Sequence, residues 1–217
     1  MSETRTRINE NTEQIVRKRT CGCKDLYVAQ VMENTSGSYV AGTPEKLARM
    51  VKIKVDEKWT SETIYSDDGP EEVITSYEGT EVEIEVNALA PQDRERIFGQ
   101  LYDKGYLVKS ANDKAPEVAT GWRERKTNGR YEFKWLYVGK FSEGITDEAS
   151  TKEGKLSPTT KSIKGKFYER EMDARYEISV DEQNLLAEHT SAKEALQNWF
   201  SVVQEYPDAA DSESGTE

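Results

Sequence analysis

The chain has 217 residues, 35% of them hydrophobic, and a formal net charge of −11. Such a length suits one domain with a modest core. The negative charge argues against a nucleic-acid-binding surface, because phosphate contacts need clustered Lys and Arg, but it allows a surface past which DNA slides without sticking. No apolar run reaches the ~20 residues of a membrane-spanning helix. The first residues also lack the apolar stretch of a signal peptide, so we expect synthesis in a cytoplasm and no membrane partner.

Composition divides the sequence into three segments. Residues 1–20 are polar and show no helical or strand periodicity, which predicts a flexible N-terminal arm. Residues 21–204 carry the periodic segments of a single domain, and the acidic residues 205–217 are expected to be disordered. Cys21 and Cys23 are expected to be free thiols, because a zinc site needs further Cys or His ligands.

The first periodic segment, residues 24–31, predicts a strand with apolar side chains on both faces. Residues 39–47 return from a turn and are interrupted by Gly42-Thr43-Pro44. This arrangement is typical of the start of an antiparallel sheet.

The stretch Met50–Leu89 predicts one very long β-hairpin. Asp68-Gly69 is a strong two-residue turn signal, and a turn there fixes the register of the two strands. The predicted apolar pairs share one face: Val51 with Val86, Ile53 with Ile84, and Val55 with Val82. The predicted charged pairs share the other face: Lys52 with Glu85, and Lys54 with Glu83. The alternative is two ordinary hairpins broken near Trp59 and Tyr77.

Each strand of this hairpin would span roughly 15 residues or about 50 Å, which a domain of this size cannot bury. The outer half is polar and carries a proline, so we expect it to lie free or to dock on another subunit. The predicted assembly residues are Ser61, Glu62, Thr63, Ile64, Tyr65, Asp67, Asp68, Gly69 and Pro70.

The second half of the chain predicts a short helix and more strands. Helical spacing favours a helix over Pro91–Tyr102, and strands are expected near residues 106–110 and 117–126. Asn128-Gly129 predicts a two-residue hairpin turn that places Trp122 opposite Trp135.

The end of the domain predicts two strands and a helix. After a polar linker over 143–159, strands over Lys161–Glu171 and Ala174–Val180 are expected to pair with each other across a tight turn. A capping box of Ser191 and Glu194 predicts a helix over Ala192–Gln204. The fold class is therefore mainly β, an antiparallel β-sandwich or incomplete barrel with a long protruding hairpin, a short mid-chain helix and a helix near the C-terminus.

No catalytic, cofactor-binding or metal-ligating motif stands out. Phosphate-binding loops, nucleophile elbows, zinc-protease motifs and EF-hand spacings are not found in the sequence. Glu81, Glu83 and Glu85 alternate with apolar residues, which is typical of a solvated strand face and not of a catalytic carboxylate pair. We therefore expect neither an enzyme nor a cofactor.

An ordered set of short segments resembles the major tail protein (tail tube protein) family of bacteriophages with long, non-contractile tails. The resemblance covers roughly residues 24–203. The segments that carry it are Lys24-Asp25-Leu26-Tyr27-Val28-Ala29, residues 39–47, residues 61–70, residues 81–86, residues 104–110, Asn128-Gly129-Arg130-Tyr131, residues 135–141 and Asn198-Trp199-Phe200. No single motif among them is diagnostic, and the charged N-terminal segment departs from the pattern.

The resemblance implies a structural virion protein that forms hexameric rings stacked into a tail tube, the conduit for DNA ejection. The implied partners are further copies of the chain, a tape-measure protein and tail-end proteins, with DNA as non-specific passing cargo and the virion tail as location. Because the long sheet lines the bore in related tubes, the implied lumen face is Lys52, Lys54, Glu81, Glu83 and Glu85. The alternative is that this face lies outside the tube and that its charges serve only solubility. The rival functions are a monomeric β-sandwich binding module for carbohydrate or surface recognition and, less favoured, a small hydrolase.

Overall fold

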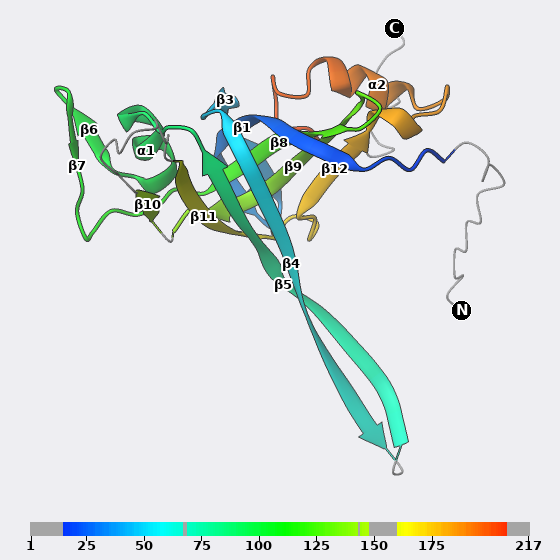
Figure 1. Ribbon diagram of the computed structural model, residues 1–217. Helices are drawn as coiled ribbons and strands as arrows, with labels where there is room; N and C mark the ends of the chain where they lie inside the picture. Colours follow the sequence, from blue (N-terminus) through cyan, green and yellow to red (C-terminus); the bar gives the residue numbers. More distant parts are fainter. Residues whose placement is uncertain (1–14, 67–68, 143, 148–159, 208–217) are drawn as a thin grey trace, which may run out of the picture.

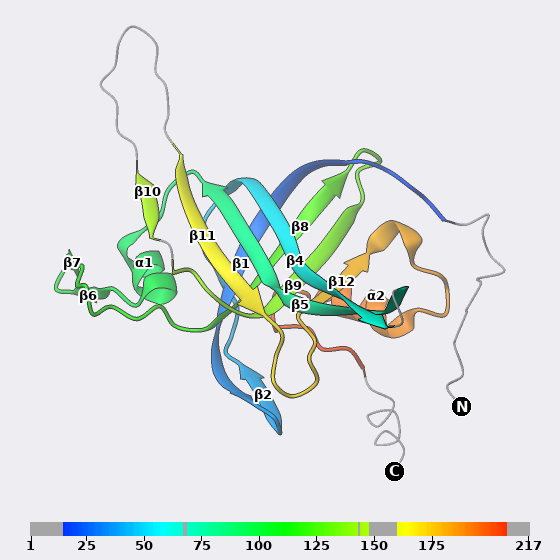
Figure 2. The same ribbon diagram turned by 90° about the horizontal axis from the view of Figure 1, so that it is seen from below.

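The protein folds as a large curled antiparallel sheet with two short helices and one hairpin that leaves the body (Figures 1 and 2). The computed structural model describes residues 15–66, 69–142, 144–147 and 160–207. The predicted fold class, mainly β with a protruding hairpin, a mid-chain helix and a helix near the C-terminus, is confirmed. Most of the N-terminal segment, the linker and the acidic tail lies outside the described residues, so the predicted segment boundaries stay predictions.

One ten-stranded sheet forms the body. Its main path runs β2 (Ser38–Ala41), β1 (Thr20–Thr35), β8 (Val118–Lys126), β9 (Tyr131–Lys140), β11 (Lys161–Tyr168), β5 (Gly69–Val86) and β4 (Met50–Ser66). Three short strands join beside this path: β3 (Glu45–Lys46) on β1, β10 (Ile145–Asp147) on β11, and β12 (Glu177–Asp181) on β9. A separate small hairpin contains β6 (Leu101–Asp103) and β7 (Tyr106–Val108).

The sheet curls until its last strand, β4, approaches β1. The thiol of Cys23 on β1 donates to the carbonyl oxygen of Val51 on β4 at 3.8 Å. The strand ladders of the described residues contain no pair between β1 and β4. The body is therefore a half-barrel with an open seam, and β4 keeps a free edge.

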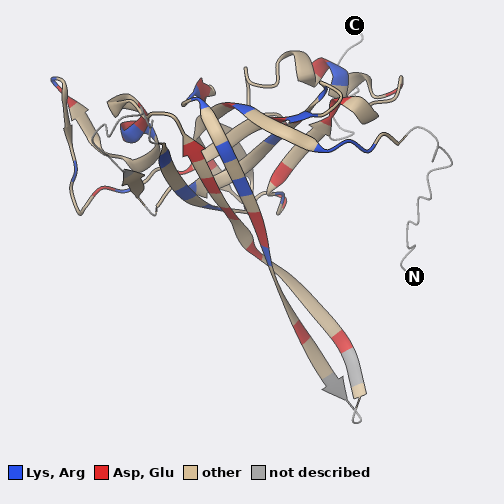
Figure 3. Ribbon diagram, in the orientation of Figure 1, with Lys and Arg blue, Asp and Glu red and all other residues tan. Residues whose placement is uncertain are grey.

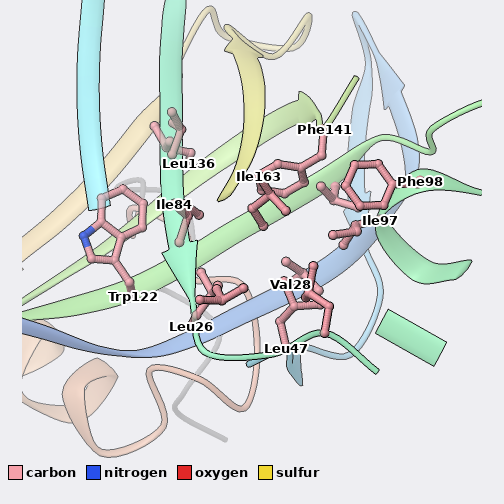
Figure 4. Close-up of a cluster of buried hydrophobic side chains, with 14 of the residues drawn as sticks. Leu26, Val28, Leu47, Ile84, Ile97, Phe98, Trp122, Leu136, Phe141 and Ile163 are labelled. Atoms are coloured by element: carbon pink, nitrogen blue, oxygen red, sulfur yellow. The ribbon is translucent and has the colours of Figure 1, made fainter. Parts of the chain in front are cut away.

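Two apolar clusters lie on the two sides of the curled sheet. The inner cluster lies inside the half-barrel and includes Leu26, Val28, Leu47, Ile84, Ile97, Phe98, Trp122, Leu136, Phe141 and Ile163 (Figure 4). The outer cluster lies under the C-terminal segment and includes Ala29, Ala119, Phe133, Trp135, Tyr137, Val138, Trp199 and Val203. The prediction that the first strand is apolar on both faces is confirmed, because Leu26 and Ala29 of β1 are buried in different clusters.

The predicted register of the β8–β9 hairpin is wrong by one residue. Lys126 pairs with Arg130 across a three-residue loop that ends in Gly129, at a φ of 83°. A glycine in the left-handed conformation is typical of such a loop. Trp135 therefore lies opposite Gly121, while Trp122 lies opposite Lys134. A one-residue slip moves side chains to the other face, so the two tryptophans belong to different clusters and do not pair.

Both predicted helices are shorter than expected. Helix α1 (Pro91–Phe98) ends at Gly99, whose φ of 66° gives a left-handed cap, so Leu101 and Tyr102 enter β6. Helix α2 (Thr190–Gln197) begins two residues before the predicted start and makes no side-chain cap, so the expected capping box is not formed. Turns follow α2 and still bury Trp199 against the sheet.

The last two strands do not pair with each other, which corrects the predicted hairpin. Strands β11 and β12 both pair with β9, so they run in the same direction along one edge of it. Residues 169–176 leave the sheet between them as a loop. The buried guanidinium of Arg170 in this loop bonds the carboxylates of Asp173 and Glu205 at 2.7–2.8 Å. Through this contact, the loop holds the chain at Glu205.

Candidate assembly surface: the long hairpin

The inner half of the β4–β5 hairpin has the predicted register. Ile53 lies opposite Ile84, and Val55 opposite Val82. The predicted pairing of Val51 with Val86 is wrong, because Met50 takes that place and the bulge leaves Val51 53% exposed. The hairpin is continuous past Trp59 and Tyr77, so the alternative of two broken hairpins is also excluded.

The outer half begins where β11 ends its pairing with β5, at Thr80. From that point β5 pairs only with β4, and Figure 1 shows the two strands projecting away from the body. We call residues 59–66 and 69–78 the hairpin arm. Register shifts after Lys58 and Ile64 move the pairing, so that Ser66 lies opposite Gly69. Gly69 therefore belongs to β5 and not to the predicted turn at Asp68-Gly69, while residues 67 and 68 lie outside the described residues.

Aromatic side chains fix the base of the hairpin arm. Tyr77 stacks on Tyr176 with ring centroids 4.2 Å apart, and its hydroxyl lies 2.6 Å from the hydroxyl of Thr80. Burial raises the pKa of Tyr77 to about 12. Trp59 pairs with Tyr77 in the ladder, with ring centroids 5.3 Å apart. Because Tyr176 belongs to the 169–176 loop, this stacking packs the base of the hairpin arm against the body. The contact therefore fixes the direction in which the hairpin arm leaves the body.

The hairpin arm presents apolar side chains that nothing covers. Glu62 pairs with Ile74, and Ile64 with Glu72, so these four residues share one surface, which we call the arm face. Ile64 is 41% exposed and Ile74 48% exposed. Among the described side chains at 61–64 and 72–76, none bonds to a residue outside the hairpin. Exposed isoleucines on a projecting ladder mark a contact surface more than a folding core.

The predicted assembly residues that the structure describes lie on the hairpin arm. Ser61, Glu62, Thr63 and Ile64 are on β4, and the backbones of Tyr65, Gly69 and Pro70 continue the ladder; Asp67 and Asp68 lie outside the described residues. Sequence reasoning missed Val73 and Ile74, which are 59% and 48% exposed. The sequence did hold a signal for them, because Val73 and Ile74 are two adjacent apolar residues in an otherwise polar stretch.

The predicted lumen residues lie together on the outer surface of the half-barrel, where blue and red bands alternate in Figure 3. They are Lys52, Lys54, Glu81, Glu83 and Glu85. The ammonium of Lys52 lies 3.7 Å from the carboxylate of Glu85, as expected. Lys54 lies opposite Glu83 in the ladder, but its ammonium contacts Asp56 at 3.4 Å.

A third strand completes this charged surface, and the sequence did not predict it. Lys164 and Lys166 of β11 lie opposite Glu83 and Glu81 of β5. The ammonium of Lys164 is 3.8 Å from the carboxylate of Glu83. The row of glutamates therefore lies between two rows of lysines, which makes the surface electrically mixed and close to balanced. The alternation of Lys164 and Lys166 with buried Ile163 and Phe167 was visible in sequence, but its place beside β5 was not.

A cluster of carboxylates lies at one end of the half-barrel, near the β8–β9 loop. Burial, reinforced by neighbouring carboxylates, raises the pKa of Glu177, and Lys134 opposes this shift. Burial alone would lower the pKa of Lys134, but Glu124, Glu177 and Glu132 together raise it. Its ammonium lies 3.5 Å from Glu132 and 3.6 Å from Glu124. One ammonium therefore lies among three carboxylates and links β8, β9 and β12.

A large open hollow lies between α2 and β12. Its volume is about 830 Å³, and its apolar lining includes Ile178, Val180, Leu185 and Trp199. The exposed side chains of Val202 and Tyr206 border it. Among the described residues, this groove is large and apolar enough to hold a ligand of moderate size.

Within the described residues, no group of three or more His, Cys, Asp or Glu side chains is placed to hold a metal ion. The described helices are all too short or too polar to cross a membrane. A scan against models of known protein families found no match for the chain, and a search among curated proteins found no similar sequence.

Proposed function

We propose that this protein is a structural subunit of a phage tail tube, in which rings of the chain stack into a conduit for DNA. The observation that carries the proposal is the hairpin arm, which projects from a fixed base with exposed Ile64, Val73 and Ile74. Its strand edges are unpaired by any other described strand. Unpaired strand edges of this kind promote aggregation of a free monomer. In an ordered assembly they can form contacts between subunits.

The open half-barrel supports the same proposal. The main path of the sheet ends at β4 on one side and at β2 on the other, so two edges are available for neighbours. Heterologous contacts between such edges close into a ring when the rotation between copies closes. Stacking of rings then needs an element that leaves the plane of the ring, which the hairpin arm supplies.

The balanced charged surface on β4, β5 and β11 suits a wall that DNA passes. Alternating Lys and Glu side chains, such as Lys164 beside Glu83, neutralise one another locally. A wall of this kind neither binds phosphates strongly nor excludes them. The partners proposed with this function are further copies of the chain, a tape-measure protein and tail-end proteins, in the tail of a virion.

The test is assembly of the purified protein and of a variant without the hairpin arm. Electron microscopy and light scattering at high protein concentration are expected to show tubes or six-fold rings for the parent. Deletion of residues 61–76, joined by a short turn, is expected to leave a folded subunit that forms no tubes, because the base residues Trp59 and Tyr77 are retained. Tubes of normal length from the deletion variant would contradict a stacking role for the hairpin arm.

The groove between α2 and β12 favours one other candidate, a monomeric module that binds a carbohydrate or another surface ligand. That function predicts a persistent monomer whose ligand affinity falls when Tyr206, which is 60% exposed at the groove, is changed to Ala. A glycan-binding screen of the parent and Tyr206→Ala, run beside the assembly test, separates the two functions.

A further inference from the structure

The exposed segment before β1 carries the opposite charge to the hairpin arm. Residues 59–78 contain six carboxylates and neither Lys nor Arg, whereas Arg17, Lys18 and Arg19 are three consecutive cations in a chain of net charge −11. All three cations are exposed, and none forms a side-chain hydrogen bond or ion pair with another described residue. Three unpaired cations beside each other in so acidic a protein call for an anionic partner.

The body holds this segment in a fixed, extended form. The backbone N–H of Val16 donates to the side-chain oxygen of Asn184 at 2.8 Å, and the Val16 carbonyl accepts from the amide nitrogen of Asn184 at 3.2 Å. The carbonyl of Arg19 accepts from the backbone N–H of Thr127 at 2.9 Å. The three cations are thus presented between two anchor points, and not on a free tail.

Apolar side chains accompany the cations. Ile15 is 44% exposed and Val16 36% exposed. They border a shallow hollow of about 540 Å³ that Arg17, Lys18 and Arg19 also line. We call residues 15–19 the cationic segment. It offers two aliphatic side chains and three cations, and the arm face offers two isoleucines and the carboxylates of Glu62 and Glu72.

We propose that the arm face of one copy docks on the cationic segment of another copy. The two surfaces lie apart in a single chain, because the hairpin arm and the segment before β1 leave the sheet in different directions (Figure 1). Copies with a net charge of −11 repel one another in most orientations. Pairing of opposite charges therefore determines how two copies align. The aliphatic side chains contribute the apolar surface that is buried in the contact.

This inference rests on the proposed self-assembly, and charge reversal tests it. The first variant carries Glu62→Lys and Glu72→Lys, and the second carries Arg17→Glu, Lys18→Glu and Arg19→Glu. Each alone brings like charges together and is expected to raise the protein concentration needed for assembly about ten-fold or more. Both are expected to keep the parental melting temperature, because all five side chains are exposed.

Mixing the two variants is the decisive step. In an equal mixture, the lysines on the arm face of the first variant can meet the glutamates at 17–19 of the second. The unchanged arm face of the second variant can meet the unchanged cations of the first. The protein concentration needed for assembly is therefore expected to return to within about two-fold of the parental value. One chain carrying all five substitutions is expected to assemble alone. A matched control, Lys104→Glu with Lys109→Glu and Lys114→Glu, makes the same change of net charge as the second variant on exposed positions elsewhere and is expected to assemble like the parent.

The outcomes separate this inference from the proposed function. A parent that stays monomeric overturns self-assembly itself. A parent that assembles, with both reversal variants assembling at the parental concentration, overturns only the docking of the arm face on the cationic segment. Failure of the mixture to recover, or loss of assembly in the matched control, also overturns it, because the effect is then one of net charge or of another partner surface.

Discussion

The two halves of the long hairpin share two strands but differ in what surrounds them. The inner half packs Val82 and Ile84 into the inner cluster and gains β11 as a third strand. The outer half has no third strand, carries two register shifts and leaves Ile64 and Ile74 exposed. The comparison shows that one continuous ladder can pack into the core at one end and leave its apolar side chains exposed at the other.

The largest expected effect on stability comes from the same substitution, isoleucine to alanine, made in each half of the hairpin. Ile84→Ala removes a fully buried side chain and is expected to lower the free energy of unfolding by about 2–5 kcal/mol. Ile74→Ala, on the hairpin arm, is expected to change it by less than about 0.5 kcal/mol while weakening assembly. Urea denaturation beside light scattering measures both. Equal loss of stability in the two variants would mean that the hairpin arm belongs to the folding unit.

A smaller effect is expected at the boundary between the halves. Gly79 has a φ of 128°, and a Cβ there would lie 2.8 Å from the carbonyl oxygen of Phe167. Gly79→Ala is expected to cost about 1–3 kcal/mol, because it adds both strain and a clash. Gly105→Ala is the matched control, since Gly105 has a φ of 83° with open space around it. Thermal unfolding of both variants measures this. An equal loss of stability in the two variants would show that the contact with Phe167 contributes nothing.

Charge reversal on the inner half tests its outer surface. Glu83→Lys with Glu85→Lys breaks the pair of Glu85 with Lys52 and places like charges beside Lys52 and Lys164. The loss of stability is expected to be about 1 kcal/mol. Assembled variant protein is also expected to bind DNA in a salt-sensitive way, in contrast to the parent. Filter binding at two salt concentrations measures this, and unchanged binding would remove this surface from the wall of the bore.

The smallest effect concerns pH. The pKa of Tyr77, at about 12 in the folded protein, lies above the ordinary value of 10.0. Its contribution to stability is therefore complete below pH 10 and is lost as the pH rises through about 12. Because Tyr77 is partly solvated, we expect this contribution to be about 1 kcal/mol or less. The stability difference between parent and Tyr77→Phe is expected to narrow over that window in urea titrations, and a constant difference would contradict the assignment.

The sequence predicted the inner half well because two independent patterns agreed there. Apolar residues such as Ile53 and Ile84 alternated with opposite charges, so only one register satisfied both faces. In the hairpin arm both faces are polar or mixed, which leaves the register weakly specified and allowed the shifts after Lys58 and Ile64. The described residues of the predicted site lie on β4 and β5, while Gly69, which was predicted in the turn, pairs with Ser66 in the ladder.

Elsewhere the errors have related causes. Strand β9 buries side chains on both faces, so alternation did not reveal whether Trp135 faced Trp122 or Gly121. The pairing of β11 with β5 joins segments about eighty residues apart in sequence, and no local signal records it. The second row of lysines, Lys164 and Lys166, was missed for this reason.

The loop at 169–176 has a mechanical consequence. It carries Tyr176, which stacks on the base of the hairpin arm, and Arg170, which is bonded to Glu205. We therefore expect a force on the hairpin arm to reach the chain at Glu205 across this one short loop. The ion pair that would carry it is only half buried, because Arg170 is fully buried while the side chain of Glu205 is 48% exposed.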